Sequence, residues 1–236
     1  MPCALGRLTI VFLMNGPPPG LPEPVGSTSR KRSPLAKPAE ACTIDAVSDK
    51  HANGRIELIH GSMFSGKTEY MIARLRQEQS RGKRVKAFKH AIDDRYDPNH
   101  LVTHQGDRFD AVRVSSAAAI PDLCDRAEVV AIDEGHFFTT ALIPVVQQLV
   151  ERGVTVVLAG ISHDAWGRPF EPIPQLAQIA DDKVVLQAPC RVCGAPAPFT
   201  QRMTPVNTLH MVGGLDDYEP RCAEHFTPLP GPPEKR

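Results

Sequence analysis

The chain has 236 residues, with 27 basic and 27 acidic side chains and 42% apolar residues. These values fit one soluble domain of moderate size with a small second module, and they supply enough apolar side chains for a buried core. The balanced charge offers no strongly basic surface for neutralising phosphates, so a nucleic acid is not expected as the main partner.

The first 52 residues form a proline-rich extension that we expect to be disordered. Such a segment lacks the apolar content that would offset the loss of chain entropy on folding. Its apolar run, Leu8 to Met14, is too short to span a bilayer and is not followed by a cleavage pattern. We therefore expect neither a membrane anchor nor secretion, and we expect residues 227–236 to be disordered as well.

The stretch IELIHGSMFSGKTEYM, which starts at residue 56, contains the phosphate-loop pattern G-x-x-x-x-G-K-[ST]. Ile56 to His60 is predicted to be a strand, and Lys67 to Arg81 a helix that stops at Gly82. Backbone N–H groups of the intervening turn would wrap the phosphates of ATP, Lys67 would reach the outer phosphates, and Thr68 would offer its hydroxyl to Mg²⁺. The residues expected to contact ATP here are Gly61, Ser62, Met63, Phe64, Ser65, Gly66, Lys67 and Thr68.

Between residues 53 and 188, short apolar runs alternate with helical stretches. One helix is predicted over Thr139 to Arg152, with Gly153 as its stop. This alternation predicts an α/β fold of the phosphate-loop type, in which helices cover a mostly parallel sheet and ligands bind at the carboxyl ends of the strands. The predicted strands after the first are Val85 to His90, Ala111 to Val114, Val129 to Asp133, Thr155 to Gly160 and Val184 to Leu186.

Asp133 and Glu134 directly follow the apolar run VVAI. An aspartate at the tip of such a strand, downstream of a phosphate loop, commonly completes the Mg²⁺ shell. The glutamate beside it can orient a water molecule, as in an ATPase, or accept a proton from an acceptor hydroxyl, as in a kinase. The two residues leave both reactions open.

A second motif lies near the C-terminal end, where CRVCG spans 190–194 and CAEHF spans 222–226. The two pairs supply three sulfur ligands and one nitrogen ligand, which fill a tetrahedral Zn²⁺ shell and indicate a structural site. Few apolar residues surround them, so the metal would contribute much of the folding free energy. We expect a separate module over 189–226, after the ATP-binding domain over 53–188, with Cys190, Cys193, Cys222 and His225 as its zinc ligands.

With these motifs assembled, the chain resembles the type II thymidine kinases, the cytosolic deoxynucleoside kinases of animals and many bacteria. The matching segments are GSMFSGKT, KHAIDDRY, VVAIDEGHFF, GRPFEPIPQL, CRVCG, MVGG and YEPRCAEHF. The resemblance implies transfer of the γ-phosphate of ATP to the 5′-hydroxyl of thymidine, giving dTMP and ADP in cytoplasmic nucleoside salvage. It further implies a lasso-like loop at about residues 200–218 that closes over thymidine, a homotetramer, and feedback inhibition by dTTP.

The resemblance also implies roles for individual residues. Glu134 would be the general base on the thymidine hydroxyl, and Asp133 and Thr68 would serve Mg²⁺. Lys67 and Arg95 would neutralise phosphate charge in the transition state. The remaining positions belong to the ATP and metal side (Asp93, Gly135 and His136) and to the nucleoside pocket (Met63, Phe170 and Tyr218).

The chain departs from the family pattern at two places. Where the family has D-F-R-G-x-P-F, residues 164–170 read DAWGRPF, so Ala165 replaces the phenylalanine that stacks near the base and Trp166 follows it. The usual glutamine of DEGQFF is His136. These departures keep a related kinase with another base preference open. A zinc-ribbon ATPase that contacts nucleic acid is the alternative from another class.

Overall fold

The computed structural model describes residues 7–12, 54–93, 97–204, 213–214 and 216–228. Within them, nine strands form one sheet in the order β1-β8-β2-β7-β6-β3-β5-β4, with β9 paired to β8, and two further strands form a separate pair. Along this order, neighbouring strands run parallel except for the antiparallel pair of β4 and β5. The strands are β1 (Arg7–Phe12), β2 (Ile56–Gly61), β3 (Val85–His90), β4 (His100–Val102), β5 (Arg108–Val114), β6 (Val129–Ile132), β7 (Thr155–Ile161), β8 (Asp182–Pro189), β9 (Pro196–Ala197), β10 (Phe199–Arg202) and β11 (Tyr218–Arg221).

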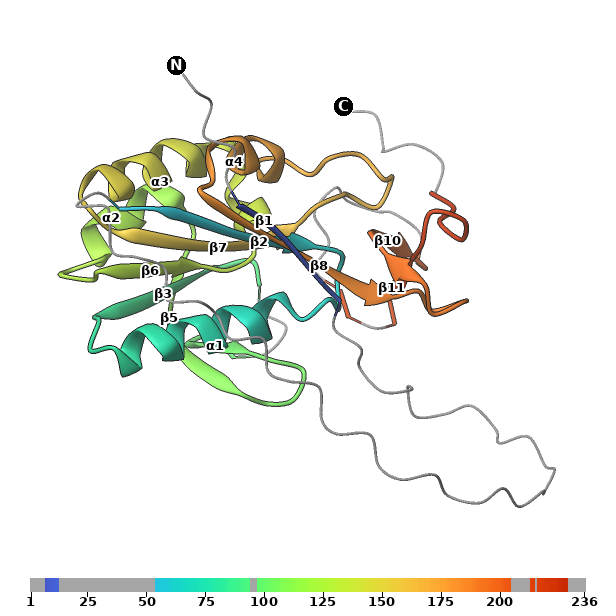
Figure 1. Cartoon of the computed structure of the whole chain (residues 1–236), viewed down its shortest axis with the longest axis horizontal. Coiled ribbons are helices and arrows are strands. Elements are labelled where there is room, and N and C mark those ends of the chain that lie inside the picture. Colours follow the sequence, from blue (N-terminus) through green and yellow to red (C-terminus); the bar gives the residue numbers. More distant parts are fainter. Residues whose placement is uncertain (1–6, 13–53, 94–96, 205–212, 215, 229–236) are drawn as a thin grey trace. The chain divides into compact units, whose positions relative to one another are not determined.

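Helices cover both faces of the sheet, which confirms the α/β prediction. Helix α1 lies on one face, and α2, α3 and α4 lie on the other (Figure 1). Alternate residues of β2 feed two apolar cores: Leu58 belongs to the core under α3 and α4, and Ile59 packs with Met71 and Leu75 of α1. The helices are α1 (Lys67–Ser80), α2 (Ile120–Leu123), α3 (Leu142–Glu151) and α4 (Ile173–Ile179), with 3₁₀ helices η1 (Ala117–Ala119) and η2 (Gly135–Ala141).

The helix predicted over Thr139 to Arg152 is two elements in the structure. The 3₁₀ helix η2 precedes α3, and within η2 Thr139 has a φ of 57°, outside the helical region, so the chain is kinked there. Gly153 follows α3 with a φ of 82°, so it ends the helix as predicted. Strand β4 and helix α4 were not predicted, because β4 has three residues and α4 carries a proline in its first turn.

The prediction that residues 1–52 are wholly disordered is wrong for Arg7–Phe12. These residues form strand β1, which pairs in parallel with β8 over six positions. The physical reason is that β8 would otherwise present unpaired backbone groups at the edge of the sheet, and an apolar, β-branched segment can pair with them. The rest of the extension and residues 229–236 lie outside the described residues. In the described part of the chain, no helix is long and apolar enough to cross a membrane.

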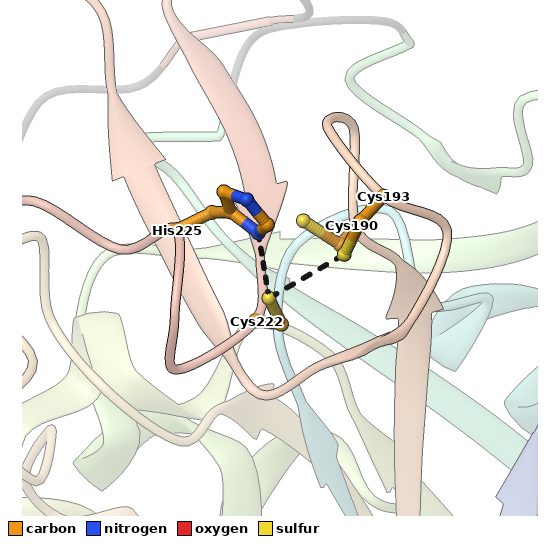
Figure 2. Close-up of side chains that lie close together, drawn as sticks. All are labelled: Cys190, Cys193, Cys222 and His225. Atoms are coloured by element: carbon orange, nitrogen blue, oxygen red, sulfur yellow. Dashed lines mark hydrogen bonds between the residues drawn. The ribbon is translucent and has the colours of Figure 1, made fainter.

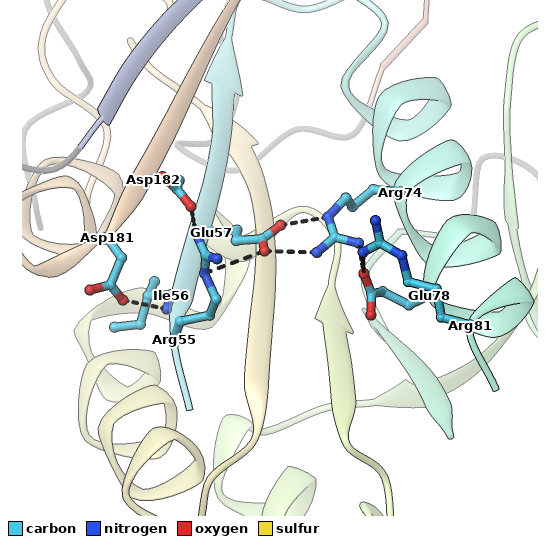
Figure 3. Close-up of polar contacts among 8 residues, drawn as sticks. All are labelled: Arg55, Ile56, Glu57, Arg74, Glu78, Arg81, Asp181 and Asp182. Atoms are coloured by element: carbon cyan, nitrogen blue, oxygen red, sulfur yellow. Dashed lines mark hydrogen bonds and ion pairs between the residues drawn. The ribbon is translucent and has the colours of Figure 1, made fainter. Parts of the chain in front are cut away.

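A network of ion pairs joins α1 to the sheet at the beginning of β2, away from the phosphate loop (Figure 3). Arg74 of α1 makes two hydrogen bonds of 2.9 Å to the carboxylate of Glu57 and also pairs with Glu78. Arg55 contacts both Glu57 and Asp182 of β8. Paired, partly buried guanidinium and carboxylate groups are strongly oriented. The network therefore fixes the direction of α1, whose other end begins at the phosphate loop.

Candidate functional site

The phosphate loop connects the carboxyl end of β2 to the first turn of α1. Gly61 is required by close approach, because a Cβ there would meet the carbonyl oxygen of Leu186 at 1.9 Å. Gly66, just before the helix, has a φ of 79°. The Lys67 Nζ donates a hydrogen bond of 2.7 Å to the carbonyl oxygen of Ser62, across the loop. The loop thus places a lysine and a helix N-terminus together, as phosphate binding requires.

A cavity beside this loop has Lys67, Thr68, Asp93, Asp133 and Glu134 in its wall. The Thr68 hydroxyl donates a hydrogen bond of 3.1 Å to Asp133. Burial and, after it, the nearby charges of Glu134 and Asp93 together raise the pKa of Asp133 to about 7. The buried carboxylates of Asp93 and Asp133, the partly buried carboxylate of Glu134 and the Thr68 hydroxyl form an oxygen-rich wall that a divalent cation would stabilise. The residues present therefore fit Mg²⁺.

Glu134 turns away from strand β6 in an uncommon backbone conformation. Its φ is 51°, and its N–H donates a hydrogen bond of 2.8 Å to its neighbour Asp133. Non-glycine residues with positive φ cost free energy and occur frequently at functional sites. The buried ring of His136 lies behind this turn, with its Nδ1 3.6 Å from the Glu134 Oε2. Gly135 and His136 are not part of the described cavity wall.

The three residues predicted for the nucleoside pocket lie in different surroundings. Met63 lines the cavity, and its N–H donates a hydrogen bond of 2.9 Å to the Thr200 hydroxyl of β10. Phe170 packs against His136, with ring centroids 4.8 Å apart, and Tyr218 is buried in β11. Neither Phe170 nor Tyr218 belongs to the described cavity wall. Their roles toward the nucleoside stay predictions.

The segment that carries Ala165 is a locally closed turn. An isolated bridge joins His163 to Pro169, and the Asp164 carboxylate accepts hydrogen bonds of 2.9 Å from the N–H groups of Trp166 and Arg168. The Arg168 guanidinium lies 5.1 Å from the centre of the Trp166 ring. The indole is therefore engaged within its own turn, and Ala165 supplies no ring of its own.

The cavity wall also contains residues that the sequence did not single out. These are Glu69 of α1, Lys89 of β3, the segment from Leu101 to His104, and Ile161 of β7. Lys89 carried a usable signal, because it stands near the carboxyl end of a predicted strand, where ligands of a parallel sheet bind. Conversely, Arg95 and residues 205–212 and 215 of the predicted lasso lie outside the described residues.

The four predicted zinc ligands lie close together, as Figure 2 shows. The ligand atoms of Cys190, Cys193, Cys222 and His225 all lie within 4.8 Å of one another. The sulfurs of Cys193 and Cys222 are 3.7 Å apart. Two sulfurs at about 2.3 Å from a tetrahedral zinc ion would be separated by about 3.8 Å, so the donor set fits Zn²⁺.

Backbone groups favour the thiolate form that zinc requires. Burial alone would raise the pKa of Cys190, but N–H groups of Cys222, Cys193 and Val192 outweigh it and lower this pKa to about 6. The buried apolar core around the site is small, consisting of Cys190, Ala197 and Cys222 with Ala195 packed against them. A bound metal would therefore contribute strongly to the stability of this region.

His60, at the end of β2, is expected to make the protein sensitive to acid. Burial and then the positive charges of His163 and Lys67 lower the pKa of His60 to about 4, and its Nδ1 lies 2.9 Å from the Ser162 hydroxyl. The unfolded chain binds this proton below about pH 6.5, whereas the folded chain does so near pH 4, so the free energy of unfolding falls as pH drops through this window. Melting temperatures measured from pH 7 to 4.5 should decline less steeply for His60→Asn than for the wild type. An equally steep decline of the melting temperature in both proteins would contradict this origin of the acid sensitivity.

Comparisons with known proteins agree on one family. A family model described as thymidine kinase matches residues 54–226. The chain is 45% identical over 175 residues to a thymidine kinase of Rhodothermus sp. (strain ITI 518), covering 74% of this chain and 82% of that protein. It is 41% identical over 179 residues to a thymidine kinase of Bdellovibrio bacteriovorus, covering 75% and 88%, respectively. With a thymidine kinase of Bacteroides thetaiotaomicron, the identity is 39% over 182 residues, covering 77% and 92%.

Proposed function

The chain belongs to the thymidine kinase family, and we propose that it transfers the γ-phosphate of ATP to the 5′-hydroxyl of thymidine, giving dTMP and ADP. The observation that carries this proposal is the shared cavity of the phosphate loop and the Asp133-Glu134 pair. A phosphate-binding lysine and a candidate general base face the same space there. This is the arrangement that phosphoryl transfer to an alcohol requires.

In the proposed reaction, Glu134 accepts the proton of the thymidine 5′-hydroxyl as the oxygen forms its bond to the γ-phosphorus. The bond between the γ-phosphorus and the bridging oxygen breaks at the same time, and ADP leaves with that oxygen. Lys67 stabilises the charge on the phosphates, and Arg95 is assigned the same role by the family resemblance. Thr68 and Asp133 would hold Mg²⁺, which neutralises phosphate charge when it is bound.

The remaining proposals concern organisation and context. We assign ATP binding to residues 53–188 and a zinc-supported nucleoside loop to the module over 189–226. The hydrogen bond from Met63 to Thr200 supports this assignment, because it links the phosphate loop directly to β10 of the module and so brings the two proposed binding regions together. A cytoplasmic location, a homotetramer and feedback inhibition by dTTP stay predictions from the resemblance.

A second candidate function is a deoxynucleoside kinase with another base preference. It is favoured by Ala165, which lacks the stacking ring, and by Trp166, whose ring lies against Arg168 within the same turn. A pocket without that ring would discriminate less strongly among bases, because stacking contributes on the order of 0.5–1.5 kcal/mol beyond burial. The reaction would be unchanged, and the enzyme would accept a wider range of deoxynucleosides.

Incubation of the purified protein with ATP, Mg²⁺ and each deoxynucleoside singly tests these proposals. We expect dTMP with thymidine, and we expect Ala165→Phe to increase the preference for thymidine over the other deoxynucleosides. Nucleoside monophosphates and free phosphate are both quantified. A monophosphate from another nucleoside in place of dTMP would favour the second candidate. Phosphate release without any nucleoside monophosphate, stimulated by nucleic acid, would refute both kinase proposals.

A further inference from the structure

Lys89 is a buried lysine in the wall of the phosphate-loop cavity, and no function has been assigned to it so far. Its side chain is 3% exposed, and it projects from β3 near the carboxyl end of that strand. Strand β3 pairs with β6 so that Phe88 is level with Ile132. Lys89 follows Phe88 in the sequence and Asp133 follows Ile132, so both lie at the same edge of the sheet.

Burial of a charged ammonium group is costly unless the group is paired and hydrogen-bonded. Lys89 meets both conditions: its Nζ lies 3.4 Å from the Asp93 carboxylate and donates a hydrogen bond of 3.0 Å to the carbonyl oxygen of Asp97. Asp93 is itself buried and stands in the same cavity wall. A lysine placed in this way holds one carboxylate by both charge and geometry.

The cavity also explains why a cation is needed beside Asp93. Asp93, Asp133 and Glu134 are three of the four carboxylates in the cavity wall, and the fourth is Glu69. Without a compensating charge, mutual repulsion would turn Asp93 away or favour its protonated form. The Lys89 ammonium offsets this repulsion at Asp93.

We propose that Lys89 is a positioning residue that keeps the Asp93 carboxylate directed into the phosphate-loop cavity, where it supports binding of the metal-bound nucleotide. This inference rests on the proposed function, in which Asp93 lies near Mg²⁺. Lys67 and Lys89 then have different tasks. Lys67 contacts the phosphates, whereas Lys89 acts through Asp93.

The test compares Lys89→Met, Asp93→Asn, the double variant and Lys86→Met. Lys86 is the matched control, because it lies on the same strand but pairs with Asp125 outside the cavity. For each protein, the melting temperature, the affinity for ATP with and without Mg²⁺, and the kinetic constants for thymidine phosphorylation are measured well below the melting temperature.

We expect Lys89→Met and Asp93→Asn each to lower kcat by about 10- to 100-fold and to raise the Mg²⁺ concentration for half-maximal rate, as loss of an outer partner of a metal ligand does. The double variant should be no slower than Asp93→Asn, because the two residues act as one unit. The KM for thymidine and all constants of Lys86→Met should stay within about twofold of the wild type. Lys89→Met should melt at a lower temperature, and the added Asp93→Asn change should restore part of this loss, because it removes a buried negative charge that has lost the ammonium group beside it.

Wild-type kcat and Mg²⁺ dependence in folded Lys89→Met would overturn the proposal and leave Lys89 a purely stabilising residue. Losses that multiply in the double variant would show that Lys89 does not act through Asp93. If Lys89→Met fails to fold, the kcat of the double variant is compared with that of Asp93→Asn. Equal values support the proposal, and a lower kcat in the double variant contradicts it. If the wild type phosphorylates no nucleoside, the proposed function fails, while the melting temperatures and the Mg²⁺-dependent ATP affinity still test the link between Lys89 and Asp93.

Discussion

Replacement of Glu134 by glutamine is expected to lower kcat for thymidine phosphorylation by about 10²- to 10⁴-fold, because glutamine keeps the size of the side chain but cannot accept the hydroxyl proton. The carboxylate belongs to the same cavity wall as Lys67 and Thr68. The backbone of Glu134 is held in its positive-φ turn by a hydrogen bond of 2.8 Å to Asp133. The substitution should therefore remove the base and leave the loop that binds ATP in place.

The measurement is kcat together with ATP affinity, for example by calorimetric titration. Glu128→Gln is the matched control, because Glu128 immediately precedes the other end of strand β6 and pairs with Lys83 and Arg84. That variant should keep kcat within about twofold of the wild type. Unchanged kcat in Glu134→Gln would eliminate Glu134 as the base. Loss of ATP affinity equal to the loss of rate would indicate that Glu134 acts in nucleotide binding instead.

Replacement of Cys190 by serine is expected to have the largest effect on stability. Cys190 is buried, and its small apolar core includes few side chains besides those of the metal ligands. In small zinc modules, the apparent metal-binding free energy of about 10–16 kcal/mol is also folding free energy. We expect Cys190→Ser to lose bound zinc and to unfold the region around β10 and β11 at a lower temperature than the rest of the chain.

The expected damage extends to the cavity, because Thr200 of β10 accepts the hydrogen bond from the Met63 N–H of the phosphate loop. Zinc per chain is measured by atomic emission, and unfolding by scanning calorimetry. Cys124→Ser is the control, since Cys124 is a buried thiol that donates to the carbonyl oxygen of Ile120 and is not part of the cluster. It should retain all of its zinc. A full complement of zinc in Cys190→Ser would contradict the proposed ligand set.

Much of the candidate site could be predicted because its residues are close in sequence. The phosphate loop from Gly61 to Thr68, the Asp133-Glu134 pair and the two zinc-ligand pairs are short motifs whose spacing is set by the chemistry that they perform. The four predicted zinc ligands do lie together, and their role in binding zinc stays a prediction. The roles of Glu134 and Lys67 in transfer stay predictions.

Other features could not be read from local patterns. Strand β1 was mistaken for part of a disordered leader, since its pairing partner β8 begins 170 residues after the end of β1 (182 against 12). Lys89 looked like an ordinary polar residue of a strand, because the burial of its charge depends on a cavity that several elements enclose. The turn at Thr139 interrupts an otherwise helical pattern, and the periodicity of apolar residues does not reveal it.

The sequence by itself determined the family, whose model matches residues 54–226, and it predicted a nucleotide-binding loop, an acidic pair after an apolar strand and a set of zinc ligands. The tertiary structure decided which distant groups meet, namely Thr68 with Asp133 and Met63 with Thr200. Motif chemistry is encoded over a few neighbouring residues, where backbone geometry and spacing are nearly fixed. Contacts between distant segments depend on strand order and on the packing of helices against the sheet, which are properties of the whole fold.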